Sequence, residues 1–360
     1  MLEARLSCSD NVRESRQTRA SQFVSLGRPG QARWLIPRNA AIVVDALSGW
    51  EPHRMTARIG WSVLKSALRW PTASRILPCS TEHFDWLCEL DWGALGWEQP
   101  SPPCPLIYLG TPGPRRKAVV HLIDARTHRC ELIVKVPLAE EAQLAIRHEA
   151  HVLLELHKEG FTDAPRLVEL NFDEGIASQT FIPGRRSGLR STREMEGALR
   201  RLSLPGESIT LQEVAGRLSQ HLPAEWLCGD GALVAAALER LDDPTQLPAA
   251  RIHGDFAPWN IMLNNGSAAL LDWEEYQPRG LPLNDAYHFF HMTRYLFGKA
   301  PRSIWQELHL QCCPSISTTM RWKLELAYLL QTLAMKLAVH DGRQTAFLLT
   351  ALRRAMASRP

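Results

Sequence analysis

The sequence lacks the features that mark several common classes of protein. Its formal net charge is only +3 over 360 residues, which is too small to indicate nucleic acid as a partner or a polybasic membrane anchor. No uninterrupted apolar run reaches the ~20 residues that a transmembrane segment requires. The eight cysteines show neither C-x-x-C nor zinc-finger spacing, and Met1–Asp10 lacks the long apolar core of a secretion signal. We therefore expect a cytoplasmic protein with reduced thiols.

The amino-acid composition changes along the chain. Residues 1–31 are rich in Ser, Arg, Gln and Gly and are expected to be disordered. Residues 32–98 form a Trp-rich N-terminal region of unassigned role, because seven of the twelve tryptophans precede residue 98. Large aromatic side chains are usually buried, so packing is the favoured interpretation, and stacking on a sugar ring is the alternative. Four prolines between residues 96 and 105 indicate a linker.

A hairpin is the clearest local structure in the second half of the chain. Asn265-Gly266 stands between two short apolar runs, and Asn-Gly is the strongest short-range signal for a two-residue turn. A turn centred there pairs Asn260 with Leu271 and so brings Asn260 beside Asp272. An amide oxygen and a carboxylate placed together suit a hard cation such as Mg²⁺.

A further carboxylate precedes this hairpin. Asp255 lies five residues before Asn260, in a segment that Pro258 keeps out of a regular helix. A carboxylate in such a position can accept the proton of an attacking hydroxyl while a cation holds phosphate groups. The spacing therefore predicts phosphoryl transfer, with Asp255 as the catalytic residue and with Asn260 and Asp272 as metal ligands.

These residues form two motifs that resemble those of a known family. Residues 253–260 read H-G-D-F-A-P-W-N, which is similar to the catalytic loop of the aminoglycoside phosphotransferase and choline kinase group. Residues 272–274 read D-W-E and stand where protein kinases carry D-F-G. The resemblance covers residues 106 to about 295 and implies ATP and Mg²⁺ as cofactors. It also implies a bilobal, protein-kinase-like α+β fold with an N-terminal extension, a small antiparallel-sheet N-lobe (99–183) and a mainly helical C-lobe (184–360) that holds the catalytic loop and the acceptor site.

The kinase template also requires a strand lysine for the nucleotide phosphates and a helix glutamate that holds this lysine. Residues 131–136 read as a strand in which Lys135 shares a face with Ile133. From about 140 to 159 the pattern is helical, and Glu149 falls on the apolar stripe that faces inward. A charged group there needs a partner to offset its desolvation, and Lys135 is the candidate. Lys135 and Glu149 are therefore predicted to belong to the nucleotide site.

The phosphate loop of the template is poorly represented. Residues 110–116 read G-T-P-G-P-R-R between two expected strands, with Gly110 and Gly113 but no G-x-G-x-x-G. Degenerate loops are common in the family that the motifs resemble, so Gly110 and Gly113 are kept as candidate nucleotide contacts.

Other polar residues near the motifs are assigned supporting roles or are left open. His253 and Asp285 are assigned to structural support of the site, since an imidazole can brace the loop and the G-x-P-x-x-D pattern of the family anchors it. Glu274 is open between a metal contact and a hairpin cap. His288 and His291 resemble half of a metal site, but no further ligand is visible nearby, so packing or capping is favoured.

The segment after the second motif limits the acceptor. Only twelve residues separate Asp272 from Asp285, and no A-P-E follows, whereas a protein kinase needs a long activation segment to dock a peptide. A small hydroxylated acceptor substrate is therefore expected. Basic residues dominate the C-terminal part of the chain, which favours a sugar or glycan precursor over a cationic drug.

We therefore expect an ATP-dependent phosphotransferase that phosphorylates a hydroxyl of a small molecule by Mg²⁺-assisted in-line transfer. The sequence does not distinguish ATP from GTP, and it indicates no oligomeric state. Two alternatives stay open. One is a catalytically inactive kinase-like binding or scaffold protein, which the poor phosphate loop favours. The other is an aminoglycoside-type antibiotic kinase.

Overall fold

The structure, a computed structural model, describes residues 23–28, 31–37, 40–44, 47, 52, 55–70, 85–190, 192–222, 229–298 and 316–358. The chain divides into two compact units, Met1–Arg185 and Arg186–Pro360, close to the boundary expected after residue 183. Each unit has hydrophobic clusters of its own. Within the described residues, no helix combines the length and apolar character needed to cross a bilayer.

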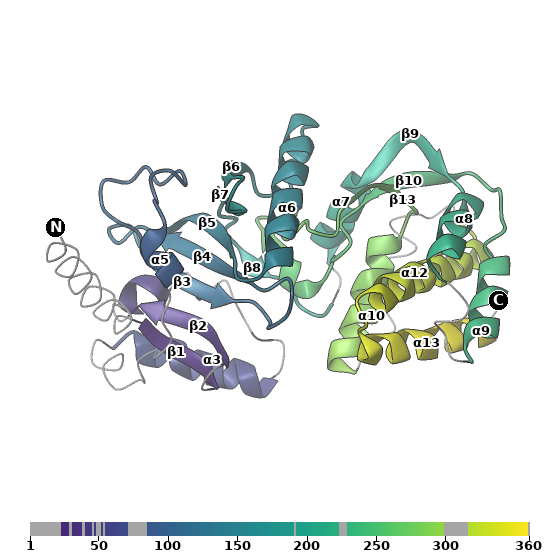
Figure 1. Cartoon of the computed structure of the whole chain (residues 1–360), viewed down its shortest axis with the longest axis horizontal. Coiled ribbons are helices and arrows are strands. Elements are labelled where there is room, and N and C mark those ends of the chain that lie inside the picture. Colours follow the sequence, from purple (N-terminus) through teal and green to yellow (C-terminus); the bar gives the residue numbers. More distant parts are fainter. Residues whose placement is uncertain are drawn as a thin grey trace, which may run out of the picture. The chain divides into compact units, whose positions relative to one another are not determined.

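The first unit is built on a seven-stranded antiparallel sheet (Figure 1). The strand order is β1-β2-β3-β4-β5-β7-β6, so nearly all neighbours in the sheet are also neighbours in the sequence. Short loops join β3 to β4, β4 to β5 and β6 to β7, as antiparallel neighbours allow, whereas α6 (Glu140–Lys158) lies between β5 and β6 in the sequence. The strands are β1 (Phe23–Arg28), β2 (Gln31–Pro37), β3 (Cys104–Leu109), β4 (Lys117–Ile123), β5 (Cys130–Pro137), β6 (Leu167–Asn171) and β7 (Ile176–Thr180).

Strand β5 has a different apolar cluster on each of its faces. Leu132, Val134 and Val136 belong to one cluster and Ile133 to the other, as the two-residue period of a strand predicts. Helix α6 (Glu140–Lys158) packs against β5, β6 and β7. The strand and the helix predicted in this part of the chain are confirmed. The remaining described helices of the unit are η1 (Ala40–Val43), α3 (Met55–Leu68) and α5 (Asp85–Glu89).

The N-terminal region continues the sheet beyond the predicted N-lobe. Strand β2 pairs with β3, and Trp34 lies opposite Tyr108. The prediction of disorder for residues 1–31 falls mostly outside the described residues, but it is wrong for β1. Phe23 and Val24 are buried in that strand, because each packs into an apolar cluster of the first unit, which the polar composition of the segment did not indicate.

Three of the N-terminal tryptophans are packing residues. Trp34, Trp61 and Trp97 are buried, and the ring centroid of Trp34 lies 5.9 Å from that of Trp61 and 4.9 Å from that of Tyr108. Trp70 differs, since it is 70% exposed at the end of α3. The buried rings support the packing interpretation over a ligand platform.

The second unit is mainly helical and carries two three-stranded sheets. One sheet has the order β13-β10-β9 and the other β12-β11-β8. The strands are β8 (Arg185–Arg186), β9 (Ser203–Ile209), β10 (Leu247–Ile252), β11 (Ile261–Asn264), β12 (Ser267–Leu270) and β13 (Gln277–Gly280). The described helices are α7 (Arg193–Arg201), α8 (Leu211–His221), α9 (Gly231–Glu239), η3 (Pro258–Asn260), α10 (Asn284–Phe297), α12 (Thr318–Ala338) and α13 (Gly342–Ala357).

Helix α12 lies at the centre of the second unit's core. It packs against α8, α9, α10 and α13, and Leu326, Leu330 and Leu333 are fully buried in the cluster that these helices share. Local signals fix where the surrounding helices begin. Thr210 and Glu213, for example, form a capping box at the start of α8. The predicted fold class, α+β with a sheet-rich first part and a helical second part, is confirmed.

Candidate active site

The hairpin of the second unit has the predicted register. Asn265 and Gly266 have φ values of 44° and 81°, and positive φ at both central residues defines the type I′ turn that Asn-Gly favours. Leu271 N–H donates to the carbonyl of Asn260 over 2.8 Å. The pairing of Asn260 with Leu271 is confirmed, and Asp272 follows directly at the strand end.

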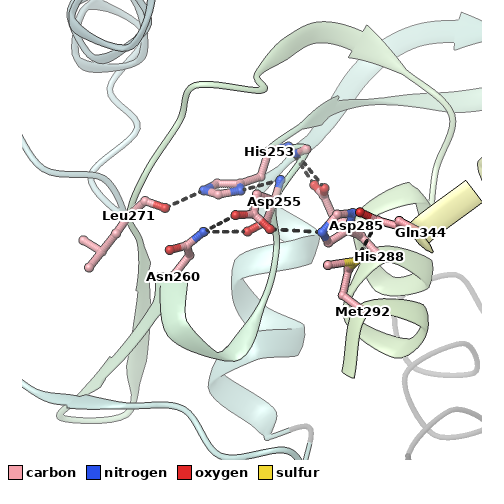
Figure 2. A network of polar contacts seen from close by, with 9 residues as sticks. His253, Asp255, Asn260, Leu271, Asp285, His288, Met292 and Gln344 are labelled. Atoms are coloured by element: carbon pink, nitrogen blue, oxygen red, sulfur yellow. Dashed lines mark hydrogen bonds and ion pairs between the residues drawn. The ribbon is translucent and has the colours of Figure 1, made fainter. Parts of the chain in front are cut away.

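Asn260 binds back to the loop that precedes the hairpin. Its side-chain Nδ2 donates to the carbonyl of Asp255 over 3.1 Å and to Asp255 Oδ2 over 2.7 Å (Figure 2). Asn260 is 5% exposed. Because both bonds use the amide nitrogen, the amide oxygen is the atom of Asn260 that suits a cation.

Asp285 ties the same loop to helix α10. Its carboxylate accepts the backbone N–H of His253 over 2.8 Å and that of Gly254 over 3.0 Å. Burial raises the pKa of Asp285 above its ordinary value, although these two donors and the charge of His253 act in the opposite direction. Asp285 therefore has the contacts that its predicted role in structural support requires.

His253 lies fully buried behind Asp255. Its Nδ1 accepts the backbone N–H of Asp255 over 3.2 Å, so its Nε2 carries the hydrogen and donates to the carbonyl of Leu271 over 3.0 Å. Burial lowers the pKa of His253 despite the carboxylates around it. The ring also lies 4.6 Å from that of Trp273, measured between centroids. A neutral imidazole in one tautomer thus connects the loop with the hairpin.

Gly254 is the residue that allows the loop to turn at this point. Its φ is 85°, and a Cβ atom there would lie 2.3 Å from the backbone oxygen of Glu275. Both the left-handed backbone and the close approach exclude a side chain. Backbone conformation and packing together therefore explain the glycine of the motif.

Asp255 is held on both carboxylate oxygens and is still accessible. His288 Nε2 lies 3.1 Å from Oδ1, opposite the bond from Asn260 to Oδ2 (Figure 2). The Asp255 side chain is 31% exposed. Burial by itself would raise the pKa of Asp255, but the hydrogen bond and the charge of His288 outweigh it and keep the pKa below its ordinary value. Asp255 is therefore an ionised carboxylate at neutral pH.

His288 is the residue that sequence reasoning missed. The sequence favoured a packing or capping role for it, whereas the structure places it against Asp255. A signal was present, since His288 follows Asp285 by three residues in a part of the chain expected to be mainly helical, and residues three apart share a helix face. His291, one turn further on, bonds to Glu325 Oε1 over 3.0 Å and not to Asp255.

The first unit holds the other predicted pair. Lys135 on β5 and Glu149 on α6 form an ion pair, and they are 5% and 2% exposed. The predicted site residues thus fall into two sets. Lys135 and Glu149 meet in the first unit, and Asp255, Asn260, His253 and Asp285 are joined by hydrogen bonds in the second, next to Asp272.

The two candidate glycines lie in the hairpin loop between β3 and β4. Gly110 N–H donates to the carbonyl of Lys117 over 2.8 Å, and a Cβ on Gly110 would lie 2.9 Å from that oxygen. The hairpin itself therefore requires Gly110. Gly113 has open space around its Cα, which makes it the better candidate for a nucleotide contact.

Comparison with known proteins assigns the chain to a family. A family model described as the phosphotransferase enzyme family (APH) matches residues 116–305, which is more than half of the chain. The protein belongs to this family. The match includes Lys135, Glu149 and the loop that carries Asp255, so both sets of predicted site residues lie within it. The suspected family is confirmed.

Solved structures of phosphotransferases are among those that match the chain. A thermostable mutant of the aminoglycoside phosphotransferase APH(4)-Ia shares 15% identity over 70% of this chain and 94% of that one, with a TM-score of 0.48. The choline kinase LicA from Streptococcus pneumoniae shares 14% identity over 67% and 89%, with a TM-score of 0.47. No curated protein matches the chain. Similarity at this level does not identify an acceptor.

Proposed function

We propose that this phosphotransferase-family protein transfers the γ-phosphoryl group of ATP to a hydroxyl of a small molecule, with Asp255 as the general base. The observation that carries the proposal is how Asp255 is held. Both carboxylate oxygens are hydrogen-bonded, and the side chain is ionised and 31% exposed. A general base must be fixed, unprotonated and within reach of the hydroxyl, and Asp255 fits all three conditions.

Asn260 and Asp272 fit a hard divalent cation. The nitrogen of the Asn260 amide is committed to Asp255, so the two side chains offer only oxygen atoms, which Mg²⁺ prefers. When bound there, Mg²⁺ supplies positive charge against the phosphate oxygens. Membership of the family supports ATP as the phosphoryl donor.

Lys135 is the proposed ligand of the α- and β-phosphates, and Glu149 holds its ammonium group in place. Both side chains are buried, and a charge in such surroundings is stable only with its partner. Gly113 is the proposed backbone contact near the same phosphates, and Gly110 supports the hairpin on which it lies.

The reaction then depends mainly on positioning. Phosphoryl transfer passes through a loose transition state, and the protein takes little part in the covalent chemistry. Asp255 orients the acceptor hydroxyl toward the γ-phosphorus and takes its proton late. Asp285 and His253 keep the loop in the conformation that makes this orientation possible.

The proposed acceptor is a small neutral or anionic alcohol, such as a sugar or a glycan precursor. The basic residues of the C-terminal part support this acceptor less than the sequence indicates, because some of them form ion pairs. Lys323 is paired with Asp243, and Arg353 with Asp230, so these two cations are not available to a ligand. Lys299 and Arg302 lie outside the described residues.

Replacing Asp255 by Asn tests the proposal. Asn keeps the size of the side chain but cannot accept a proton, so we expect ADP production with a panel of sugars, amino alcohols and aminoglycosides to fall at least about 1000-fold. ATP binding, measured by calorimetry, should stay within about threefold of wild type. Asp173→Asn, in an exposed turn of the first unit, is the matched control. Wild-type turnover in Asp255→Asn would remove Asp255 from the reaction, and no turnover by the wild type with any acceptor would favour the inactive binding protein.

A further inference from the structure

Among the described residues, His288 is the one hydrogen-bond partner of the Asp255 carboxylate that comes from outside the catalytic loop. Asn260 binds Oδ2 from five residues away, whereas His288 reaches Oδ1 from α10, 33 residues later. Figure 2 shows the two groups on different sides of the Asp255 carboxylate. The His288 side chain is 12% exposed and that of Asp255 is 31% exposed. His288 is therefore less exposed than the base that it contacts.

The direction of this hydrogen bond follows from the chemistry of the two groups. An ionised carboxylate has no hydrogen to donate, so Nε2 of His288 is the donor and Oδ1 of Asp255 the acceptor. Because Asn260 donates to Oδ2, a rotation of the carboxylate would break two charge-assisted bonds at once. The remaining lone pairs of the carboxylate are the ones that an acceptor hydroxyl can use.

His288 is itself held firmly. Asp285, one helical turn earlier on α10, accepts two backbone N–H groups of the catalytic loop. Helix α10 is thus joined to the loop twice, through the backbone by Asp285 and through the side chain of Asp255 by His288. The ring of Tyr328, on α12, meets the His288 ring edge-on with 6.1 Å between centroids. These contacts leave the imidazole little freedom to turn away.

We propose that His288 is a positioning residue of the transfer reaction, which sets the orientation of the Asp255 carboxylate toward the acceptor hydroxyl. The inference rests on the proposed function, because it assigns His288 a task only if Asp255 is the base. It goes beyond the sequence motifs, since His288 belongs to neither of them. His288 acts through Asp255 and touches no reacting atom.

The test compares two substitutions of the same residue. His288→Phe keeps a flat ring against Tyr328 but has no donor, and we expect kcat to fall about 10- to 100-fold because the base is misplaced. The KM for ATP should stay within about twofold, since the nucleotide residues are untouched. His288→Gln places an amide N–H near the position of Nε2 and should recover kcat to within about threefold of wild type.

His291 provides the matched control. It lies one turn further along α10, and its ring stacks on Tyr328 with 5.4 Å between centroids, but its hydrogen bond goes to Glu325. His291→Phe should therefore keep kcat near wild type, and its melting temperature measures the cost of losing a histidine from this helix. Equal kcat losses in His288→Phe and His291→Phe would overturn the inference. So would a His288→Gln variant no better than His288→Phe.

A spectroscopic readout needs no acceptor. In the wild type, the side-chain ¹⁵N spectrum should show a protonated Nε2 on His288, and its chemical shift should change in Asp255→Asn while the signals of His291 stay in place. An unchanged His288 signal would overturn the inference. The proposed function fails separately, through wild-type turnover of Asp255→Asn, so the two failures can be told apart.

Discussion

Lys135 in the first unit and Asp255 in the second are both charged side chains of the candidate site, but they are held differently. Lys135 forms a buried ion pair with Glu149, which lies 14 residues later on α6. Asp255 is fixed by Asn260 and His288 at its carboxylate and by His253 at its backbone. Lys135 is thus held through a buried ion pair, and Asp255 through a network of hydrogen bonds.

The difference has physical consequences. Removing one member of a buried ion pair leaves the other as an uncompensated charge, so the fold is damaged together with the site. Asp255 keeps other hydrogen-bond partners when one is lost and is partly exposed, so such a loss should change its orientation more than the stability of the fold. Substitutions at Lys135 should therefore lower stability and activity together, whereas substitutions around Asp255 should lower activity with little change in stability.

Lys135→Met is expected to have the largest effect on stability. The buried Glu149 carboxylate loses its partner, which should lower the free energy of unfolding by about 3–5 kcal/mol. Chemical denaturation of the full-length protein, followed by tryptophan fluorescence, measures the loss. ADP production should also become undetectable.

The double variant Lys135→Met/Glu149→Leu separates the two effects. It replaces the pair by apolar side chains and should regain most of the lost stability while remaining inactive. If the single variant were within about 1 kcal/mol of wild type, as for an exposed pair, the pair would not contribute to stability as a buried ion pair does.

Gly254→Ala is expected to have the second-largest effect on stability. Its Cβ would collide with the backbone of Glu275 at a positive φ, which should cost about 2–4 kcal/mol and displace Asp255. Gly266→Ala is the control, because Gly266 has a similar φ but nothing within 4 Å of an added Cβ; it should cost about 1 kcal/mol and leave turnover unchanged. Thermal unfolding and initial rates measure both. Equal losses of activity in the two variants would show that the loop does not depend on the close packing at Gly254.

Lys323→Met is expected to have the smallest effect of the three. Lys323 lies 2.6 Å from Asp243 and holds the pKa of that carboxyl down to about 2 from 3.8, together with Thr245. Because the folded-state pKa is the lower one, the stabilisation is complete above about pH 4 and is lost as the pH falls toward 2. The variant should lose about 1–2 kcal/mol at neutral pH.

Denaturation at pH 7 and at pH 2.5 checks this prediction. The difference in stability between the two pH values should shrink in Lys323→Met. Lys336→Met, on the same helix, should leave that difference as it is in the wild type. An unchanged pH dependence in Lys323→Met would mean that Asp243 owes its low pKa to other neighbours.

The sequence predicted those parts of the site whose cause is local. The turn at Asn265 and Gly266 is set by two residues, and it fixes the pairing of Asn260 with Leu271. The Lys135–Glu149 pair follows from two regular periods, that of a strand and that of a helix, which together face both side chains inward. Such patterns can be read without knowing how the chain folds back.

Other parts depend on contacts between distant residues. His288 meets Asp255 only because α10 begins directly after Leu283, whose φ is 65°. The sheet of β9, β10 and β13 was not predicted either, since its strands are short and β9 contains Pro205 and Gly206, residues that usually interrupt strands. The partners of these strands lie far away in sequence, so no local periodic pattern predicts the pairing.

The two N-terminal strands determine which strand forms the solvent-exposed edge of the sheet. A strand at the edge of a sheet exposes unpaired backbone donors and acceptors, and such an edge recruits strands from other molecules. In the full chain β2 covers β3. A protein shortened to begin at residue 99 would present the apolar strand Cys104–Leu109 as its new edge. We therefore expect the tryptophan-rich region to protect the phosphotransferase fold from aggregation, and a truncated protein to associate at concentrations at which the longer chain does not.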